Sequence, residues 1–176
     1  MFNRKPKIYI ARAMTGFDQA EIVRQASDDK AFFENAGFEV LCPVLKEKVK
    51  PVHKALSSDV KHMNIYWPQD KRMIREANAL VNMSPHVASL GVIREHGYAR
   101  YHLWKKVVSI FPKGKLPTIS SVANYEDDAV VESREEAAIY LLKTYGTYWK
   151  RLCWRIHMYK RSWLKAKWYR LLEWFR

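Results

Sequence analysis

Five short apolar runs alternate with stretches of helical periodicity along the first 145 residues of the chain. Runs of this length, bounded by turn residues, predict buried strands, and the stretches between them predict helices. Residues 45–69 are expected to form a loop because three prolines lie in or beside them. The predicted strands are 7–11, 38–44, 79–83, 106–111 and 128–133, and the predicted helices are 18–35, 70–78, 89–104 and 134–145.

Strands that alternate with helices predict an α/β fold with a doubly wound, Rossmann-like parallel sheet of about five strands. We assign this fold to residues 1–145. Ligands of such sheets bind outside the carboxyl ends of the strands. The turns after the first three strands are therefore expected to face one crevice.

The composition changes after Gly146. Residues 147–176 contain five of the seven tryptophans and neither proline nor glycine, and residues 141–176 contribute +9 of the formal net charge of +13. We predict a basic, Trp-rich helical tail over residues 146–176. Lys and Arg interleaved with aromatic residues fit contact with nucleic acid or with an anionic membrane surface. Packing on the domain, or formation of an oligomer, is the third interpretation.

The 176 residues are 48% hydrophobic, enough for one globular domain with an appendage. No apolar run of eighteen residues and no signal-peptide pattern occurs, so we expect a cytoplasmic protein. The two cysteines form neither a disulfide framework nor a zinc spacing, and the six histidines show no ligand spacing. We therefore expect neither a metal nor a cofactor.

A candidate phosphate site follows the third predicted strand. Ser89 can cap the helix at 89–104, Gly91 lets a ligand approach the backbone, and Val92 adds another amide of the first turn. Free amides at a helix start favour an anion such as phosphate. An ordinary capped helix explains the same residues, so the pattern alone leaves both interpretations open.

Glu95 lies six residues after Ser89, among apolar and small residues. A carboxylate in such surroundings is costly unless it has a partner or a chemical role. The alternative to a chemical role is a structural salt bridge from Glu95 to Arg94, Arg100 or a residue of another helix.

Three segments of the chain together resemble a known family. The segments KIYIARAMTG, DKRMIREANALV and SLGVIREHGYARYHLWKKVVSIF are similar to the nucleoside 2-deoxyribosyltransferase-like superfamily, including 2'-deoxynucleoside 5'-phosphate N-hydrolases and small phage proteins that open with IYIAGPMTG. The resemblance covers about residues 7–112. It implies cleavage of the N-glycosidic bond between base and sugar, with a glutamate as nucleophile or sugar-contacting carboxylate and an aspartate as acid/base.

Four residues match the family's site. The resemblance assigns the glutamate to Glu95, the aspartate that opens the preceding helix to Asp70, and the strand tyrosine that orients the glutamate to Tyr9. Ser89 stands where the transferases often have a second aspartate, as in the monophosphate hydrolases. A hydroxyl at a helix start can donate a hydrogen bond to a 5'-phosphate, whereas a carboxylate would repel it. Ser89 therefore favours nucleotides over nucleosides.

The turn after the first strand departs from the family pattern. Arg12 and Ala13 replace the usual Gly-Pro-like pair. Arg12 either contacts phosphate, together with Thr15 and Gly16, or blocks the site.

Three further positions have weaker assignments. Tyr66 and Trp67 either stack on a base or pack against the fold, and packing is favoured. Asn78, where relatives often have aspartate, is expected to be structural.

Two functions from different classes follow. The first is a nucleotide N-glycosidase, or a (deoxy)ribosyltransferase, that acts on a nucleoside monophosphate and forms a dimer. The second is an inactive protein with a nucleotide-binding fold, whose tail at 146–176 binds nucleic acid or an anionic membrane surface.

Overall fold

A computed structural model of the chain describes residues 5–14, 17–46, 59–87, 89–114 and 127–146. The chain divides into two compact units, Met1–Ala138 and Ile139–Arg176. The predicted boundary after residue 145 stays a prediction. Residues 147–176 of the tail predicted at 146–176, together with Thr15 and Gly16, lie outside the described residues.

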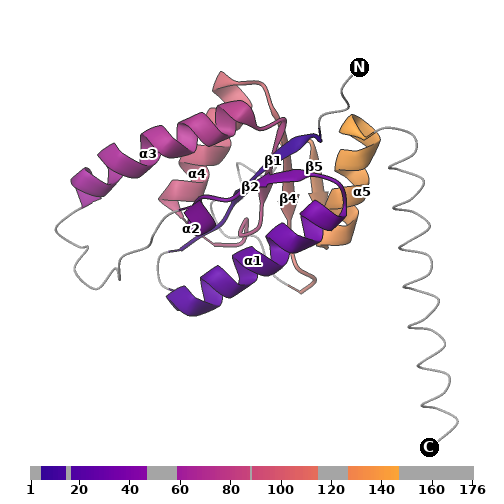
Figure 1. The fold of residues 1–176 in the computed structure, drawn as a ribbon, viewed down its shortest axis with the longest axis horizontal. Helices are drawn as coiled ribbons and strands as arrows, with labels where there is room; N and C mark the ends of the chain where they lie inside the picture. Colours follow the sequence, from indigo (N-terminus) through magenta and orange to yellow (C-terminus); the bar gives the residue numbers. More distant parts are fainter. Residues whose placement is uncertain (1–4, 15–16, 47–58, 88, 115–126, 147–176) are drawn as a thin grey trace, which may run out of the picture. The chain divides into compact units, whose positions relative to one another are not determined.

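The first unit contains a sheet of five parallel strands, in the order β2-β1-β3-β4-β5 (Figure 1). The α/β, doubly wound fold predicted from the sequence is thereby confirmed. The chain runs from β1 to β2 in one direction and then returns past β1 to β3, so the carboxyl ends of β1 and β3 form the topological switch point. The strands are β1 (Lys7–Ala11), β2 (Glu39–Leu41), β3 (Ala79–Asn82), β4 (Lys106–Ile110) and β5 (Ala129–Val131).

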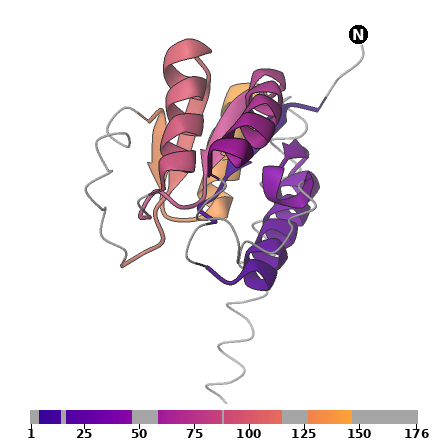
Figure 2. The same cartoon turned by 90° about the vertical axis from the view of Figure 1, so that its left-hand side faces the viewer.

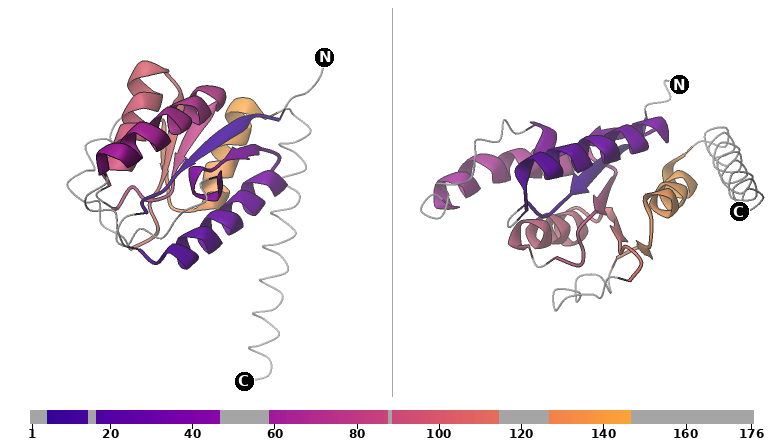
Figure 3. Two further views of the ribbon diagram at one scale, coloured as in Figure 1. Left: turned by 60° about the vertical axis from the view of Figure 1, so that its left-hand side comes forward. Right: turned by 90° about the horizontal axis from the view of Figure 1, so that it is seen from below.

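Helices cover both faces of the sheet. Figure 2 shows α3 (Asp59–Glu76) and α4 (Leu90–Gly97) side by side on one face, and α1 (Gln19–Asn35) on the other. Helix α1 packs beside β2 and the short helix α2 (Pro43–Lys46) (Figure 3). Because both faces are covered, β1 and β3 are apolar along nearly their whole length.

Side chains of β1 alternate between the two faces. Tyr9 and Ala11 belong to the core cluster beneath α3 and α4, together with Leu80 of β3. Ile8 and Ile10 are also fully buried, and the alternation of the strand directs them to the other face. The odd-numbered residues of β1 are therefore the ones that can reach a site formed with α3 and α4.

The ends of α1 agree with its predicted signals. Asp18 caps the first turn by accepting the backbone N–H of Glu21 at 2.9 Å. Gly37 stops the helix with a φ of 99°, a conformation that glycine adopts without steric cost. Asn78 is structural, as expected, because its Oδ1 accepts the backbone N–H of Lys7 at 2.7 Å.

The predicted loop at 45–69 is wrong at both ends: Leu45 and Lys46 belong to α2, and residues 59–69 belong to α3. Residues 47–58 lie outside the described residues. Helix α3 begins at Asp59 and includes Pro68, whereas the sequence interpretation placed a helix start at Asp70. A proline within a helix costs roughly 3 kcal/mol, but Met73 and Ile74 of the same helix are buried in the core and offset that cost. Asp70 therefore lies in the last two turns of a long helix and does not open a short one.

Several other elements are shorter than predicted, and β5, predicted at 128–133, spans only Ala129–Val131. The strand predicted at 38–44 ends at Leu41, because Pro43 begins α2, where the fixed φ and the missing N–H of proline suit a first helical position. The helix predicted at 89–104 is α-helical only to Gly97 and continues as the π-helical turn η2 (Tyr98–His102).

Trp104 follows η2 with a φ of 52° and is 86% exposed. Within the described part of the chain, Trp104 is the only residue other than glycine that has a positive φ.

Apart from Gly146, the described part of the second unit belongs to helix α5 (Arg134–Tyr145), which begins in the first unit. Leu141 and Leu142 of this helix are buried. No helix among the described residues combines the length and the apolar character needed to cross a membrane.

Candidate functional site

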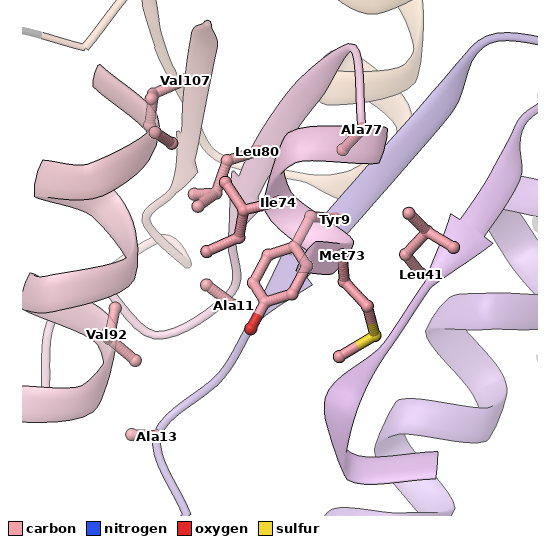
Figure 4. Close-up of a cluster of buried hydrophobic side chains, with 11 residues drawn as sticks. Tyr9, Ala11, Ala13, Leu41, Met73, Ile74, Ala77, Leu80, Val92 and Val107 are labelled. Atoms are coloured by element: carbon pink, nitrogen blue, oxygen red, sulfur yellow. The ribbon is translucent and has the colours of Figure 1, made fainter. Parts of the chain in front are cut away.

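Tyr9 is the central side chain of the candidate site. Its ring lies among Met73, Ile74 and Ala11, and its hydroxyl points toward the end of the strand where Ala13 and Val92 lie (Figure 4). Burial, and after it the negative charges of Glu95 and then Asp70, raise the pKa of Tyr9 well above its ordinary value. A hydrogen bond between the Tyr9 hydroxyl and the Glu95 side chain adds to this rise of the pKa, after the burial and the two charges.

Helix α3 contributes Asp70, whose charge also acts on the Tyr9 hydroxyl. Its side chain is buried, with 9% exposure, and its Oδ1 has no hydrogen-bond partner within the described part of the chain. Burial raises the pKa of Asp70 from 3.8 to about 6, because a charged carboxylate loses the solvation of water. A carboxyl group with this pKa can hold a proton near neutral pH and release it, as a general acid must.

Glu95 is contributed by α4. The residue is half-buried, and its Oε2 is inaccessible to solvent. Its charge is the strongest of those that act on Tyr9, ahead of that of Asp70. Three residues that are distant in the sequence are thus brought within electrostatic reach of one another by β1, α3 and α4.

The first turn of α4 holds the three residues predicted to bind phosphate. Ser89 is the N-cap residue, with φ −127° and ψ 117°, but its side chain makes no capping hydrogen bond. Gly91 is exposed, and a Cβ there would meet Ser89 Oγ at 3.8 Å, so packing does not require glycine. Val92 is buried against the Tyr9 cluster, which leaves only its amide for a ligand. The phosphate role of these three residues stays a prediction.

Arg12 turns toward α1. Its Nη1 donates to Oε1 of Gln25 at 2.6 Å, and its Nη2 forms an ion pair with the buried carboxylate of Asp29. Asp29 also accepts from Nη1 of Arg134 at 2.9 Å. Arg12 is thus held by two residues of α1, and contact between its guanidinium and a phosphate stays a prediction.

A cleft of about 410 Å³ is lined in part by Arg12 and Arg134. Arg12, Ser84, Ile110 and Glu132, which line it, follow or end the strands β1, β3, β4 and β5, so the cleft lies at the carboxyl edge of the sheet. A second hollow of about 640 Å³ lies at the amino ends of β1 and β2, where Lys7 and Glu39 form an ion pair. This hollow lies at the amino edge of the sheet, away from the side chains of Tyr9, Asp70 and Glu95.

Trp67 joins α3 to α4 beside the candidate site. Its ring centroid lies 5.6 Å from that of Tyr98, and the guanidinium carbon of Arg94 lies 4.7 Å from the Trp67 centroid. Lys71 approaches the same ring at 5.7 Å. These contacts agree with the packing interpretation of Trp67.

The sequence interpretation missed a buried pair next to Glu95. His96 is 2% exposed, and its Nε2 pairs with Oδ1 of Asp127. Arg100, considered above as a partner of Glu95, pairs with Asp128 at 2.8 Å. The adjacent acids of the sequence DD at 127–128 and the i, i+4 spacing of His96 and Arg100 were the available signals.

No protein-family model matches the chain, and no curated protein is significantly similar to it in sequence. Solved structures do match. A conserved protein from Enterococcus faecalis V583 superposes with a TM-score of 0.57 at 16% identity, over 77% of this chain and 96% of that one. A 2-deoxyribosyltransferase from Bacillus psychrosaccharolyticus superposes with a TM-score of 0.55 at 18% identity, over 75% and 90% of the respective chains. The resemblance noted from the sequence is confirmed at the level of the fold: this chain has the α/β fold of a nucleoside 2-deoxyribosyltransferase.

Proposed function

We propose that the protein cleaves the N-glycosidic bond of a nucleoside 5'-monophosphate and passes the sugar phosphate to water or to a second base. The observation that carries this proposal is the convergence of Tyr9, Asp70 and Glu95, with one carboxyl group whose pKa is raised to about 6. Glycosidic cleavage needs a carboxylate beside the sugar and a proton donor beside the leaving group. The fold shared with a 2-deoxyribosyltransferase supports the same reaction class.

Each residue has a separate role in the proposed reaction. Asp70 protonates the departing base as the C1'–N bond breaks and its electron pair moves to the base nitrogen. The carboxylate of Glu95 stabilises the positive charge that develops at C1', or captures C1' by forming a C–O bond. Tyr9 stays protonated because its pKa is raised, so its hydroxyl can donate to the Glu95 carboxylate and orient it.

Water or an acceptor base then attacks C1'; where Glu95 has captured C1', that C1'–O bond breaks and its electron pair returns to the Glu95 carboxylate. The proton of the attacking group passes to the carboxylate of Asp70. This return of the proton restores the acid for the next turnover.

The 5'-phosphate is assigned to the first turn of α4. The Ser89 side chain makes no capping hydrogen bond, so its hydroxyl is available to a ligand, and the amides of the turn favour an anion. We expect nucleoside monophosphates to be better substrates than nucleosides, and Ser89→Asp to erase that preference because a carboxylate repels phosphate. The measurement is kcat/KM for matched nucleoside and nucleotide pairs.

Ser89→Ala is the matched control, since it removes the hydroxyl without adding charge and should weaken the preference only in part. Equal use of nucleosides and monophosphates by the unmodified protein would contradict the phosphate assignment while leaving base release itself intact.

The pKa of Asp70 predicts the pH dependence of the reaction. A general acid works in its protonated form, and Asp70 loses its proton as the pH rises through about 6. We therefore expect kcat/KM to decline above pH 6 by up to about tenfold per pH unit. A profile that stays level to pH 8 would remove Asp70 from the role of acid.

A further inference from the structure

Two adjacent aspartates bind side chains of the helical segment that carries Glu95. His96, the next residue along α4, is buried and pairs through Nε2 with Oδ1 of Asp127, whose side chain is fully buried. One turn further on, Nη1 of Arg100 donates to Oδ2 of Asp128 at 2.8 Å. We call Asp127 and Asp128 the aspartate pair. Its two members bind two consecutive turns of the same helical segment.

The aspartate pair is itself fixed to the sheet. Asp128 Oδ2 accepts the backbone N–H of Val107 at 3.0 Å, and its Oδ1 accepts from Nζ of Lys106 at 2.6 Å. The backbone N–H of Asp128 donates to the carbonyl oxygen of Val107 at 2.9 Å. The pair therefore connects α4 and η2 to the start of β4, which pairs with β3 in the centre of the sheet.

A buried polar contact at this place is hard to explain by stability alone. Removing a carboxylate and an imidazole from water is costly, and well-packed apolar residues often stabilise a core as much or more. Oδ2 of Asp127 is buried without a hydrogen-bond partner among the described residues, which adds to the cost. What a directional contact supplies, and an apolar one does not, is a defined orientation.

Orientation matters here because of helix geometry. Consecutive helical residues lie about 100° apart around the axis, since a turn takes 3.6 residues. Fixing His96 therefore also fixes the direction of Glu95. The π-helical turn η2 begins two residues after His96, and π-turns are uncommon and concentrate at functional sites. The helical segment changes there from α-helical to π-helical geometry. A contact that fixes His96 therefore restricts rotation of α4 about its own axis at this junction.

We propose that His96 and Asp127, supported by Arg100 and Asp128, are positioning residues that set the rotation of α4 and hold Glu95 against Tyr9. Their kinetic role rests on the proposed glycosidic function. Their effect on the geometry of Glu95 does not.

The test compares two substitutions of one residue in the full-length protein. His96→Leu fills the space but removes the donor, whereas His96→Gln keeps an N–H donor near the position of Nε2. We expect His96→Leu to lower kcat by about 10-fold to 10²-fold with KM little changed, because a displacement of about 1 Å in a reacting group has effects of this size. His96→Gln should recover most of the loss. The exposed His102, changed to Gln, is the control.

A second readout does not depend on activity. Nuclear magnetic resonance of tyrosine labelled with carbon-13 at the ζ-carbon, with Tyr9 assigned by Tyr9→Phe, follows the chemical shift of Tyr9 at neutral pH, which reports the charge and hydrogen bonding around its hydroxyl. The resonance should move in His96→Leu, as the Glu95 carboxylate moves away, and should keep its position in His96→Gln. Glu95→Gln gives the size of the full Glu95 contribution.

Each outcome has a defined meaning. Unchanged kcat and an unchanged Tyr9 resonance in a folded His96→Leu protein would overturn the positioning role. Absence of base release by the unmodified protein would overturn the proposed function, and the Tyr9 resonance would still decide the positioning. If His96→Leu does not fold, Asp127→Asn, which keeps the acceptor oxygen and removes the charge, undergoes the same two measurements.

Discussion

Replacing Glu95 by glutamine is expected to reduce base release by about 10²-fold or more, the usual effect of losing a positioned catalytic carboxylate. Glutamine keeps the shape and one oxygen of the side chain but removes the charge that stabilises or captures the sugar cation. Because Glu95 is half-buried and glutamine is nearly the same size and shape, the fold should remain intact. The measurement is the rate of base release at saturating nucleotide.

The matched control is Glu76→Gln, an exposed glutamate at the end of α3. It makes the same chemical change on a neighbouring helix and should retain full activity. Turnover by Glu95→Gln close to that of the control would remove Glu95 from the mechanism. Global unfolding of Glu95→Gln, seen by circular dichroism, would favour a structural salt bridge.

Replacing Asp70 by asparagine is expected to have two opposite effects. Base release should drop by about 10²-fold or more, because the proton donor is lost. The free energy of unfolding should rise by about 1–2 kcal/mol above pH 7, since the substitution removes a buried negative charge. The pKa of Asp70 increases from 3.8 to about 6 on folding, and water at the edge of the carboxylate reduces the full effect of that shift.

The sign of the stability effect depends on pH. Between pH 3.8 and about 6 the folded protein binds a proton at Asp70 that the unfolded chain has released, so the stability of the unmodified protein declines as the pH rises through this window. Asp70→Asn lacks this proton and should gain its advantage over the same window. Denaturant unfolding of both proteins at pH 4 and pH 7.5 measures the difference. A variant that is less stable at both pH values would mean that Asp70 is held by a partner that compensates its charge.

Most of the fold could be predicted from the sequence because its strands are buried on both faces. Tyr9 and its neighbours in β1 form a short apolar run between polar turns, and Gly37 marks the end of α1. The start of α3 could not be predicted, because Pro68 is a local signal against helix and the burial of Met73 and Ile74 that overrides it is a tertiary effect.

The candidate site was predictable where it follows a local motif. Tyr9, Asp70 and Glu95 were identified through their resemblance to a family pattern, and the parallel topology brings them together. The contacts of Arg12 with Asp29 and of His96 with Asp127 join residues 17 and 31 positions apart. Neither spacing corresponds to a helical or strand repeat, so only the folded chain reveals these partners.

The most direct test of the account is the release of free base from nucleoside 5'-monophosphates by the full-length protein. The purified protein is incubated with a panel that covers each base, with ribose and with deoxyribose, in the presence and absence of a second base as acceptor. Chromatography then measures free base and exchanged nucleotide. We expect release or exchange with at least one monophosphate, and neither with Glu95→Gln. A folded protein that leaves every member of the panel unchanged would contradict the proposed activity.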